Sequence, residues 1–286
     1  MFPFGREANP TASIQTPQAG PPLKKPLVMD LLSQLSYDLL NELLEHDTMK
    51  GCEFMIKLTC TTFAEYMPKK TRTNMSTVVK SVTLLQWAHG QGCPWNEDTC
   101  ATAAEGGHLD SLKYARENGC PWNASTCATA ARGGHLDCLK YAHENGCPWD
   151  ASTCVAAAKG GHLVCLKYAH ENDCVWYMWT CDTAARGGHL DCLKYLHENG
   201  CPWDALTCAA ASEGGHLDCL KYVHEHGCPW DAWTCADAAR GGHLDSLKYA
   251  HENGCPWDAS TCEAAAKGGH LDCLMYAHEH GCARDI

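Results

Sequence analysis

The sequence predicts an all-α solenoid of stacked repeats, because two markers recur at one fixed period. Cysteines stand 27 residues apart at Cys93, Cys120, Cys147, Cys174, Cys201, Cys228, Cys255 and Cys282. Gly-Gly-His triplets keep the same spacing and end at His108, His135, His162, His189, His216, His243 and His270. A period of this length indicates a repeat architecture, in which each unit buries its apolar face only against its neighbours. The expected product is a long surface without an enclosed pocket, which favours a binding scaffold.

Each 27-residue unit predicts two short helices, as residues 147–173 illustrate. Asp150 is placed to cap a first, alanine-rich helix over residues 151–159 by accepting from backbone N–H groups at its start. The glycine pair at 160–161 ends that helix, because glycine adopts the left-handed conformation at low cost. A second helix is predicted over residues 162–172, with apolar side chains on more than one face. A Cys-Pro-Trp turn then leads into the next unit, since proline prevents the helix from continuing.

The pattern Thr-Cys-x-x-Ala-Ala-x-Gly-Gly-His-Leu-Asp-Cys-Leu-Lys-Tyr-x-His-Glu-Asn-Gly resembles the ankyrin repeat over residues 81–286. The likeness lies in the Thr that opens the first helix, the Ala-Ala pair, the Gly-His-Leu turn and the end of the second helix. Ankyrin repeats are about 33 residues long, so these units lack about six residues. The missing residues fall where the family carries its β-hairpin finger. The resemblance implies an ankyrin-like solenoid of about seven repeats, and it implies protein–protein binding through helix faces. Residues 81–92 resemble a second helix alone, which would start the stack.

The N-terminal region differs from the repeats. Residues 1–29 are rich in Pro, Thr, Gln and Gly, and we expect them to be disordered. Residues 30–80 are expected to form a helical cap. Within it, the segments Leu35-Ser-Tyr-Asp-Leu-Leu-Asn-Glu-Leu-Leu and Phe54-Met-Ile-Lys-Leu-Thr-Cys-Thr-Thr-Phe63 together resemble an F-box. That resemblance implies binding of a Skp-type adaptor, and therefore a role as substrate adaptor of a ubiquitin ligase, through Leu39, Leu40, Leu43 and Phe63. The alternative is a cap that only stabilises the solenoid.

Composition narrows the functional class. The 286-residue chain carries a formal net charge of −12 with acids and bases interspersed, so no basic footprint for nucleic acid is present. No apolar run is long enough to span a bilayer, and the first 29 residues lack the apolar core of a secretory signal. We therefore expect an intracellular protein, cytoplasmic or nuclear, that is a monomer and whose 22 cysteines are reduced.

A zinc or thiol-redox protein is the alternative from another class, because Cys and His recur at short spacing. Zinc sites are usually built on C-x₂₋₄-C pairs, and the chain contains no C-x-x-C. Moreover, the cysteine of the second helix is replaced by Ser111 and Ser246 in two units. Free cysteine is commonly a small buried hydrophobe, so we predict no metal and no cofactor. Histidines repeated in every unit likewise indicate architecture, and we predict no catalytic residue.

Positions where the units differ are the best candidates for binding. The residue before the repeated Thr is small or polar in four units but large and apolar in three successive ones, at Trp179, Leu206 and Trp233. In the turn before Trp179, Tyr177 and Met178 replace the usual Asp-Ala. Aromatic residues and Met are favoured interface anchors. We predict that these five residues bind a protein partner; the alternative is that they fill gaps left by the shortened finger.

Overall fold

The computed structural model describes residues 75–90 and 92–282. Clustering of contacts divides the chain into residues 1–70 and residues 71–286, and the second unit holds everything described below. The predicted tail and most of the predicted cap, including Leu39, Leu40, Leu43 and Phe63, lie outside the described residues.

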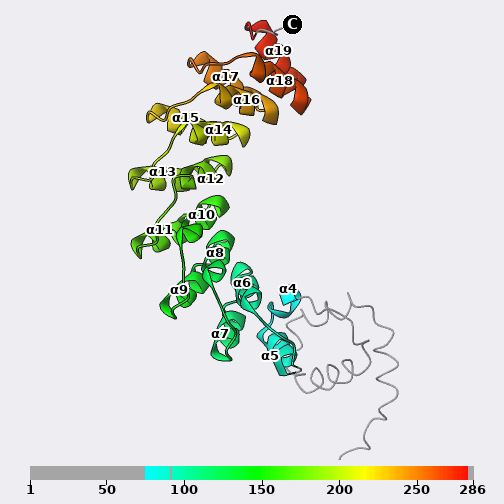
Figure 1. The fold of residues 1–286 in the computed structure, drawn as a ribbon, viewed down its shortest axis with the longest axis vertical. Helices are drawn as coiled ribbons and strands as arrows, with labels where there is room; N and C mark the ends of the chain where they lie inside the picture. The colour runs from blue at the N-terminus through cyan, green and yellow to red at the C-terminus, as the bar shows by residue number, and fades with distance from the viewer. Residues whose placement is uncertain (1–74, 91, 283–286) are drawn as a thin grey trace, which may run out of the picture. The chain divides into compact units, whose positions relative to one another are not determined.

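Seven helix pairs follow one another along the described chain, one pair per 27-residue unit (Figure 1). We number these units repeats one to seven. Their first helices are α6 (Glu97–Glu105), α8 (Ala124–Gly133), α10 (Ala151–Gly160), α12 (Thr180–Arg186), α14 (Ala205–Glu213), α16 (Ala232–Gly241) and α18 (Ala259–Gly268). Their second helices are α7 (Leu109–Glu117), α9 (Leu136–Glu144), α11 (Leu163–Glu171), α13 (Leu190–Glu198), α15 (Leu217–Glu225), α17 (Leu244–Glu252) and α19 (Leu271–Glu279). No strand occurs among these described residues, so the all-α solenoid predicted from the period is confirmed.

The predicted helix boundaries follow from local backbone chemistry. In repeat three the Asp150 carboxylate accepts a hydrogen bond from the backbone N–H of Ser152 at 2.9 Å, which satisfies one of the free donors at the start of α10. At the other end Gly161 adopts φ 74°, in the left-handed region, and its N–H bonds back to α10. The structure therefore confirms both the cap and the glycine stop that the sequence predicts.

First helices pack side by side along the stack, and each second helix packs on its own first helix. First helices of successive repeats lie closer together than second helices do, because their faces consist mainly of small residues. The largest fully buried side chains are leucines, and six of them lie at equivalent positions of the second helices, at Leu112, Leu139, Leu166, Leu193, Leu220 and Leu247. Each repeat thus completes its core only against its neighbours, as expected of a solenoid.

Histidine, tryptophan and tyrosine side chains join successive second helices. The His143 ring stacks on Trp149 with ring centroids 3.7 Å apart, and its Nδ1 lies 3.1 Å from the hydroxyl of Tyr168 in the next repeat. The same stacking is present at the equivalent positions of four other turns, and at a further turn the His170 and Trp176 rings meet with a tilt. The tryptophans therefore cover the seam between successive repeats, and the histidines pack against them.

The stack begins before the half-unit expected from the sequence. Helix α5 (Val82–Gly90) corresponds to the predicted lone second helix, but the one-turn helix α4 (Met75–Val78) precedes it and packs against α6. Val79, which follows α4, is almost fully buried. The described residues therefore include a shortened first helix that the 27-residue pattern does not predict, because this turn lacks the repeat's marker residues.

Candidate protein-binding face

The three large apolar exceptions to the repeat pattern are exposed. Trp179 is 48% exposed, Leu206 60% and Trp233 58%. Each lies at the start of a first helix, in repeats four, five and six, where other repeats carry Ser or Asp. Because a side chain that filled a gap would be buried, the exposed fractions disfavour the gap-filler alternative. We call Trp179, Leu206 and Trp233 the apolar column.

The turn into repeat four departs furthest from the pattern. Tyr177 and Met178 are exposed, at 42% and 59%, and the Tyr177 and Trp179 rings stack with centroids 4.5 Å apart. Tyr177 stands where other repeats carry the capping Asp or Asn, so α12 starts later, at Thr180. The Thr180 hydroxyl accepts from the Tyr177 N–H at 3.1 Å and donates to the Tyr177 carbonyl at 2.7 Å. This local bonding holds the turn while leaving its aromatic side chains exposed.

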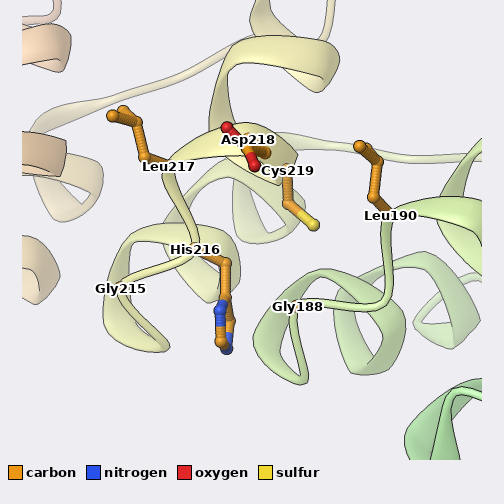
Figure 2. Close-up of a pocket in the computed structure, with 7 residues that line it drawn as sticks. All are labelled: Gly188, Leu190, Gly215, His216, Leu217, Asp218 and Cys219. Carbon is orange, nitrogen blue, oxygen red and sulfur yellow. The ribbon is translucent and has the colours of Figure 1, made fainter.

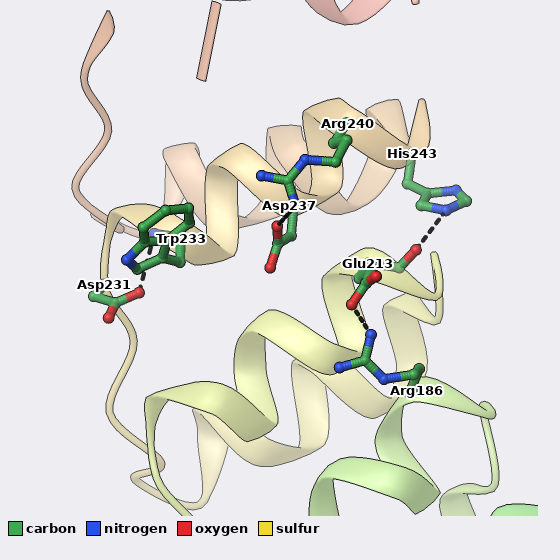
Figure 3. Close-up of polar contacts among 7 residues, drawn as sticks. All are labelled: Arg186, Glu213, Asp231, Trp233, Asp237, Arg240 and His243. Atoms are coloured by element: carbon green, nitrogen blue, oxygen red, sulfur yellow. Dashed lines mark hydrogen bonds and ion pairs between the residues drawn. The ribbon is translucent and has the colours of Figure 1, made fainter. Parts of the chain in front are cut away.

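Carboxylates accompany the apolar column. Asp204 accepts from the backbone N–H of Leu206 at 2.9 Å, and Asp231 accepts from that of Trp233 at 3.0 Å. On α12, Asp182 accepts a hydrogen bond from the hydroxyl of Thr207 on α14. Asp237 pairs with Arg240 at 2.5 Å (Figure 3). Burial raises the pKa of both Asp182 and Asp237.

Sequence reasoning did not single out Asp182 and Asp237. The signal was available, because the two positions after the first-helix cysteine are mostly Ala or Thr and become acidic in repeats four and six, and also in repeat seven at Glu263. These carboxylates lie on the same two helices as Trp179 and Trp233, so the face combines apolar and acidic groups.

Cations lie at the opposite ends of the first helices. Arg186 of repeat four forms an ion pair with Glu213 of repeat five, and both side chains are about half exposed (Figure 3). Arg132 and Glu105 form the equivalent pair between repeats two and one at 2.9 Å. Such exposed pairs contribute little stability, so this end of the first helices is a solvated face.

Gly-Gly-His turns have a structural role. The His189 and His243 rings each place Nε2 3.0 Å from a backbone carbonyl at the end of the preceding repeat's first helix. A shallow hollow lies beside one such turn, lined by Gly188, Leu190, Gly215, His216, Leu217, Asp218 and Cys219 (Figure 2). Since equivalent residues occur in most repeats, this hollow reflects the repeat architecture rather than a special site.

The thiols are part of the repeat architecture as well. Of the cysteines in the described part of the chain, all but the half-buried Cys93 are buried, and none forms a disulfide. The Cys174 thiol donates to the backbone carbonyl of Asp150 at 3.1 Å, and equivalent turn cysteines repeat this bond. Burial raises the pKa of Cys138 and Cys165 to about 11, which suppresses thiolate reactivity there.

Turn cysteines differ from those of the second helices. The thiol of Cys154 lowers the pKa of Cys174 by hydrogen bonding, and the thiol of Cys127 does the same for Cys147. Both turn cysteines remain buried. No group of three or more His, Cys, Asp or Glu side chains arranged to hold a metal ion occurs within residues 75–90 and 92–282.

Comparison with known proteins identifies the repeats. The family model for ankyrin repeats (many copies) matches residues 181–224, which lie in repeats four and five. The helix pairs of repeats four and five thus match ankyrin repeats, as the sequence pattern predicts, and the same 27-residue pattern recurs in the other repeats. Ankyrin repeats are protein–protein interaction units, and stacked repeats of this kind present extended binding surfaces.

Among solved structures, the chain is similar to the ankyrin repeat domain of human ASB11. The two share 21% sequence identity with a TM-score of 0.49, over 62% of this chain and 96% of that chain. The comparison with curated proteins gives no match. Within the residues that the structure describes, no helix combines the length and the apolar character needed to cross a membrane.

Proposed function

We propose that the protein binds a partner protein on the row of first helices in repeats four to six, with Trp179, Leu206 and Trp233 as anchors. The observation that supports this most directly is the exposure of all three side chains at equivalent positions of successive repeats. An apolar side chain in water gains free energy by burial at an interface, and Trp is the residue most enriched among interface hot spots. Tyr177 and Met178 extend the surface at its repeat-four end.

The test compares partner capture by the full chain with capture by a triple variant, Trp179→Ser, Leu206→Ser and Trp233→Ser. Serine is the residue that repeats two, three and seven carry at this position, so the helices should form as before. A matched control is Val164→Asp, because Val164 is 61% exposed on a second helix where the other repeats carry Asp. Proteins retained by the wild type and by the control but lost from the triple variant would support the proposal.

Thermal unfolding of the same variants separates binding from stability. Truncating a buried Trp typically costs about 3–5 kcal/mol, whereas these half-exposed side chains should each cost only about 1–2 kcal/mol. Single variants that lose as much stability as buried tryptophans do, or capture that survives all three substitutions, would refute the proposal.

A substrate-adaptor role is a second candidate, and only the sequence pattern of residues 30–66 supports it. In that case residues Leu39, Leu40, Leu43 and Phe63 would hold a Skp-type adaptor while the repeats bind the substrate. The two roles are compatible, because the repeats would bind a protein partner in either case.

A further inference from the structure

The row of first helices in repeats four to six is acidic as well as apolar. Residues 177–186, 204–213 and 231–240 contain five acids and two bases, which gives this row a formal charge of −3. The five acids are Asp182, Asp204, Glu213, Asp231 and Asp237, and the two bases are Arg186 and Arg240. Both arginines already pair with carboxylates of the row, Glu213 and Asp237. The charge that a partner meets is therefore negative.

The acidic groups are placed beside the anchors. Asp204 and Asp231 precede Leu206 and Trp233 by two residues, and each uses Oδ1 to cap its helix. Burial is the main cause of the raised pKa of Asp182; the hydrogen bond from Thr207 opposes it, and the nearby charge of Asp204 adds a smaller upward shift. Each of repeats four to six thus carries an apolar anchor and at least one carboxylate on its first helix or at that helix's start, with the stacked rings of Tyr177 and Trp179 at the repeat-four end.

Helix packing determines the spacing of the anchors. Neighbouring packed helices lie about 8–10 Å apart, so equivalent side chains of repeats four, five and six follow one another at about that distance. A polyproline II segment rises about 3.1 Å per residue with three residues per turn, so every third side chain lies on one face at intervals of about 9.3 Å. A β-strand repeats its face at about 6.8 Å, which does not fit. Polyproline II segments also dock on exposed aromatic side chains.

We infer that the partner of this face is a basic segment in polyproline II conformation, with an apolar side chain at every third position and Arg or Lys between. The apolar side chains would contact Trp179, Leu206 and Trp233. Intervening cations would approach Asp204 and Asp231, and an Arg would also lie favourably over a Trp ring. This inference rests on the proposed function and specifies its partner.

Two synthetic peptides test the charge. The first repeats Leu-Pro-Arg three times, and the second repeats Leu-Pro-Glu three times, so both present leucine at the same spacing. Binding of fluorescein-labelled peptide to the full chain is measured by anisotropy at low and high salt. The basic peptide should bind at least tenfold more tightly than the acidic one, and its affinity should fall as salt screens the charges.

Variants of the chain test the site. The double variant Asp204→Asn and Asp231→Asn removes two charges. Asn can still cap the helices, because Asn123 caps α8 in this chain. This pair should weaken the basic peptide about fivefold and reduce its salt dependence. The matched control, Asp150→Asn with Asp258→Asn, makes the same change at caps outside repeats four to six and should leave binding within twofold. Trp179→Ser with Trp233→Ser should weaken binding about 30-fold or more.

A third peptide, with the same composition as the basic one but with its leucines adjacent, tests the spacing and should bind at least tenfold more weakly. The inference is overturned if the basic and acidic peptides bind equally or if neither binds. It is also overturned if the two Asp pairs have equal effects, or if the shuffled peptide binds as well as the ordered basic peptide. None of these results would refute the proposed function, which stands or falls on whether captured proteins depend on the apolar column.

Discussion

Substituting alanine for Gly215 should destabilise the solenoid more than the same change at any ordinary left-handed glycine. Gly215 has φ +72°, and a Cβ built there overlaps the imidazole ring of His243 in the next repeat. That ring cannot retreat easily, because it also lies against Gly241 of its own turn. Its Nε2 is bonded to the carbonyl of Glu213 at 3.0 Å. The substitution therefore combines backbone strain with a clash between repeats.

The magnitude follows from these two contributions. A non-glycine residue in the left-handed region costs about 1–2 kcal/mol, and forcing an extra methyl group into packed surroundings costs about 1–3 kcal/mol. Gly215→Ala should thus reduce the free energy of unfolding by about 2–5 kcal/mol. Two glycines isolate the strain alone: Gly254 (φ +83°) and Gly269 (φ +75°) have no atom within 4 Å of a built Cβ. Gly269 occupies the position of Gly215 in repeat seven, which no described repeat follows, so alanine there should cost only about 1–2 kcal/mol.

Urea unfolding followed by circular dichroism measures the three variants under one set of conditions, with an unchanged slope as the check that midpoints report stability. Adding His243→Ala to Gly215→Ala completes a double-mutant cycle, and the two substitutions should show a favourable coupling because the smaller side chain removes the clash. If Gly215→Ala were no more destabilising than Gly254→Ala and Gly269→Ala, the contact between the histidine ring and the preceding turn would not stabilise the stack.

Three further predictions concern pH, thiols and the N-terminal region. Burial and the neighbouring His226 lower the pKa of His197, against the opposing effect of Glu198. Because this folded pKa lies below the unfolded value of about 6.5, the stability of the fold should fall as pH drops below about 6.5. In urea unfolding measured across pH, His226→Asn should reduce that loss. Titration of denatured, unreduced protein should find nearly all cysteines as free thiols, whereas stoichiometric zinc in elemental analysis or mostly blocked thiols would contradict this. Deleting residues 1–66 should abolish co-purification of a Skp-type adaptor and leave the solenoid folded; if the full chain never binds an adaptor, the segment is only a cap and the deletion should lower the stability of the solenoid.

Local chemistry explains how much of the fold the sequence could predict. Helices predicted over residues 151–159 and 162–172 correspond to α10 (Ala151–Gly160) and α11 (Leu163–Glu171). These boundaries depend on a capping Asp and a glycine pair, which act within a few residues of the chain. The partner of His143 could not be predicted in the same way, because its contact with Tyr168 joins residues 25 apart and depends on how successive repeats are rotated against each other. Helix α4 was missed because it carries none of the repeat's markers.

The candidate face was only partly predictable for a similar reason. Comparison of the repeats identified Trp179, Leu206 and Trp233, since equivalent positions in a stack must form a column. Whether such side chains are exposed depends on how closely first helices approach, and no single repeat encodes that distance. The acidic character of the face was missed because Asp182 and Asp237 occupy adjacent rather than equivalent positions of their repeats, and only the structure brings them onto one row.

The turn into repeat four gives up local stability where it exposes the most apolar surface. Its cap is Trp179, which makes no side-chain capping bond, and loss of an Asp cap typically costs about 1 kcal/mol. Asp173 also holds φ +66° where most repeats use glycine, a conformation that non-glycine residues adopt rarely. In the same turn Val175, Tyr177 and Met178 are exposed to water. The missing cap, the left-handed Asp173 and the exposed apolar side chains all occur in this one turn, and none of them stabilises the solenoid. A partner that buries this turn is the best explanation for them.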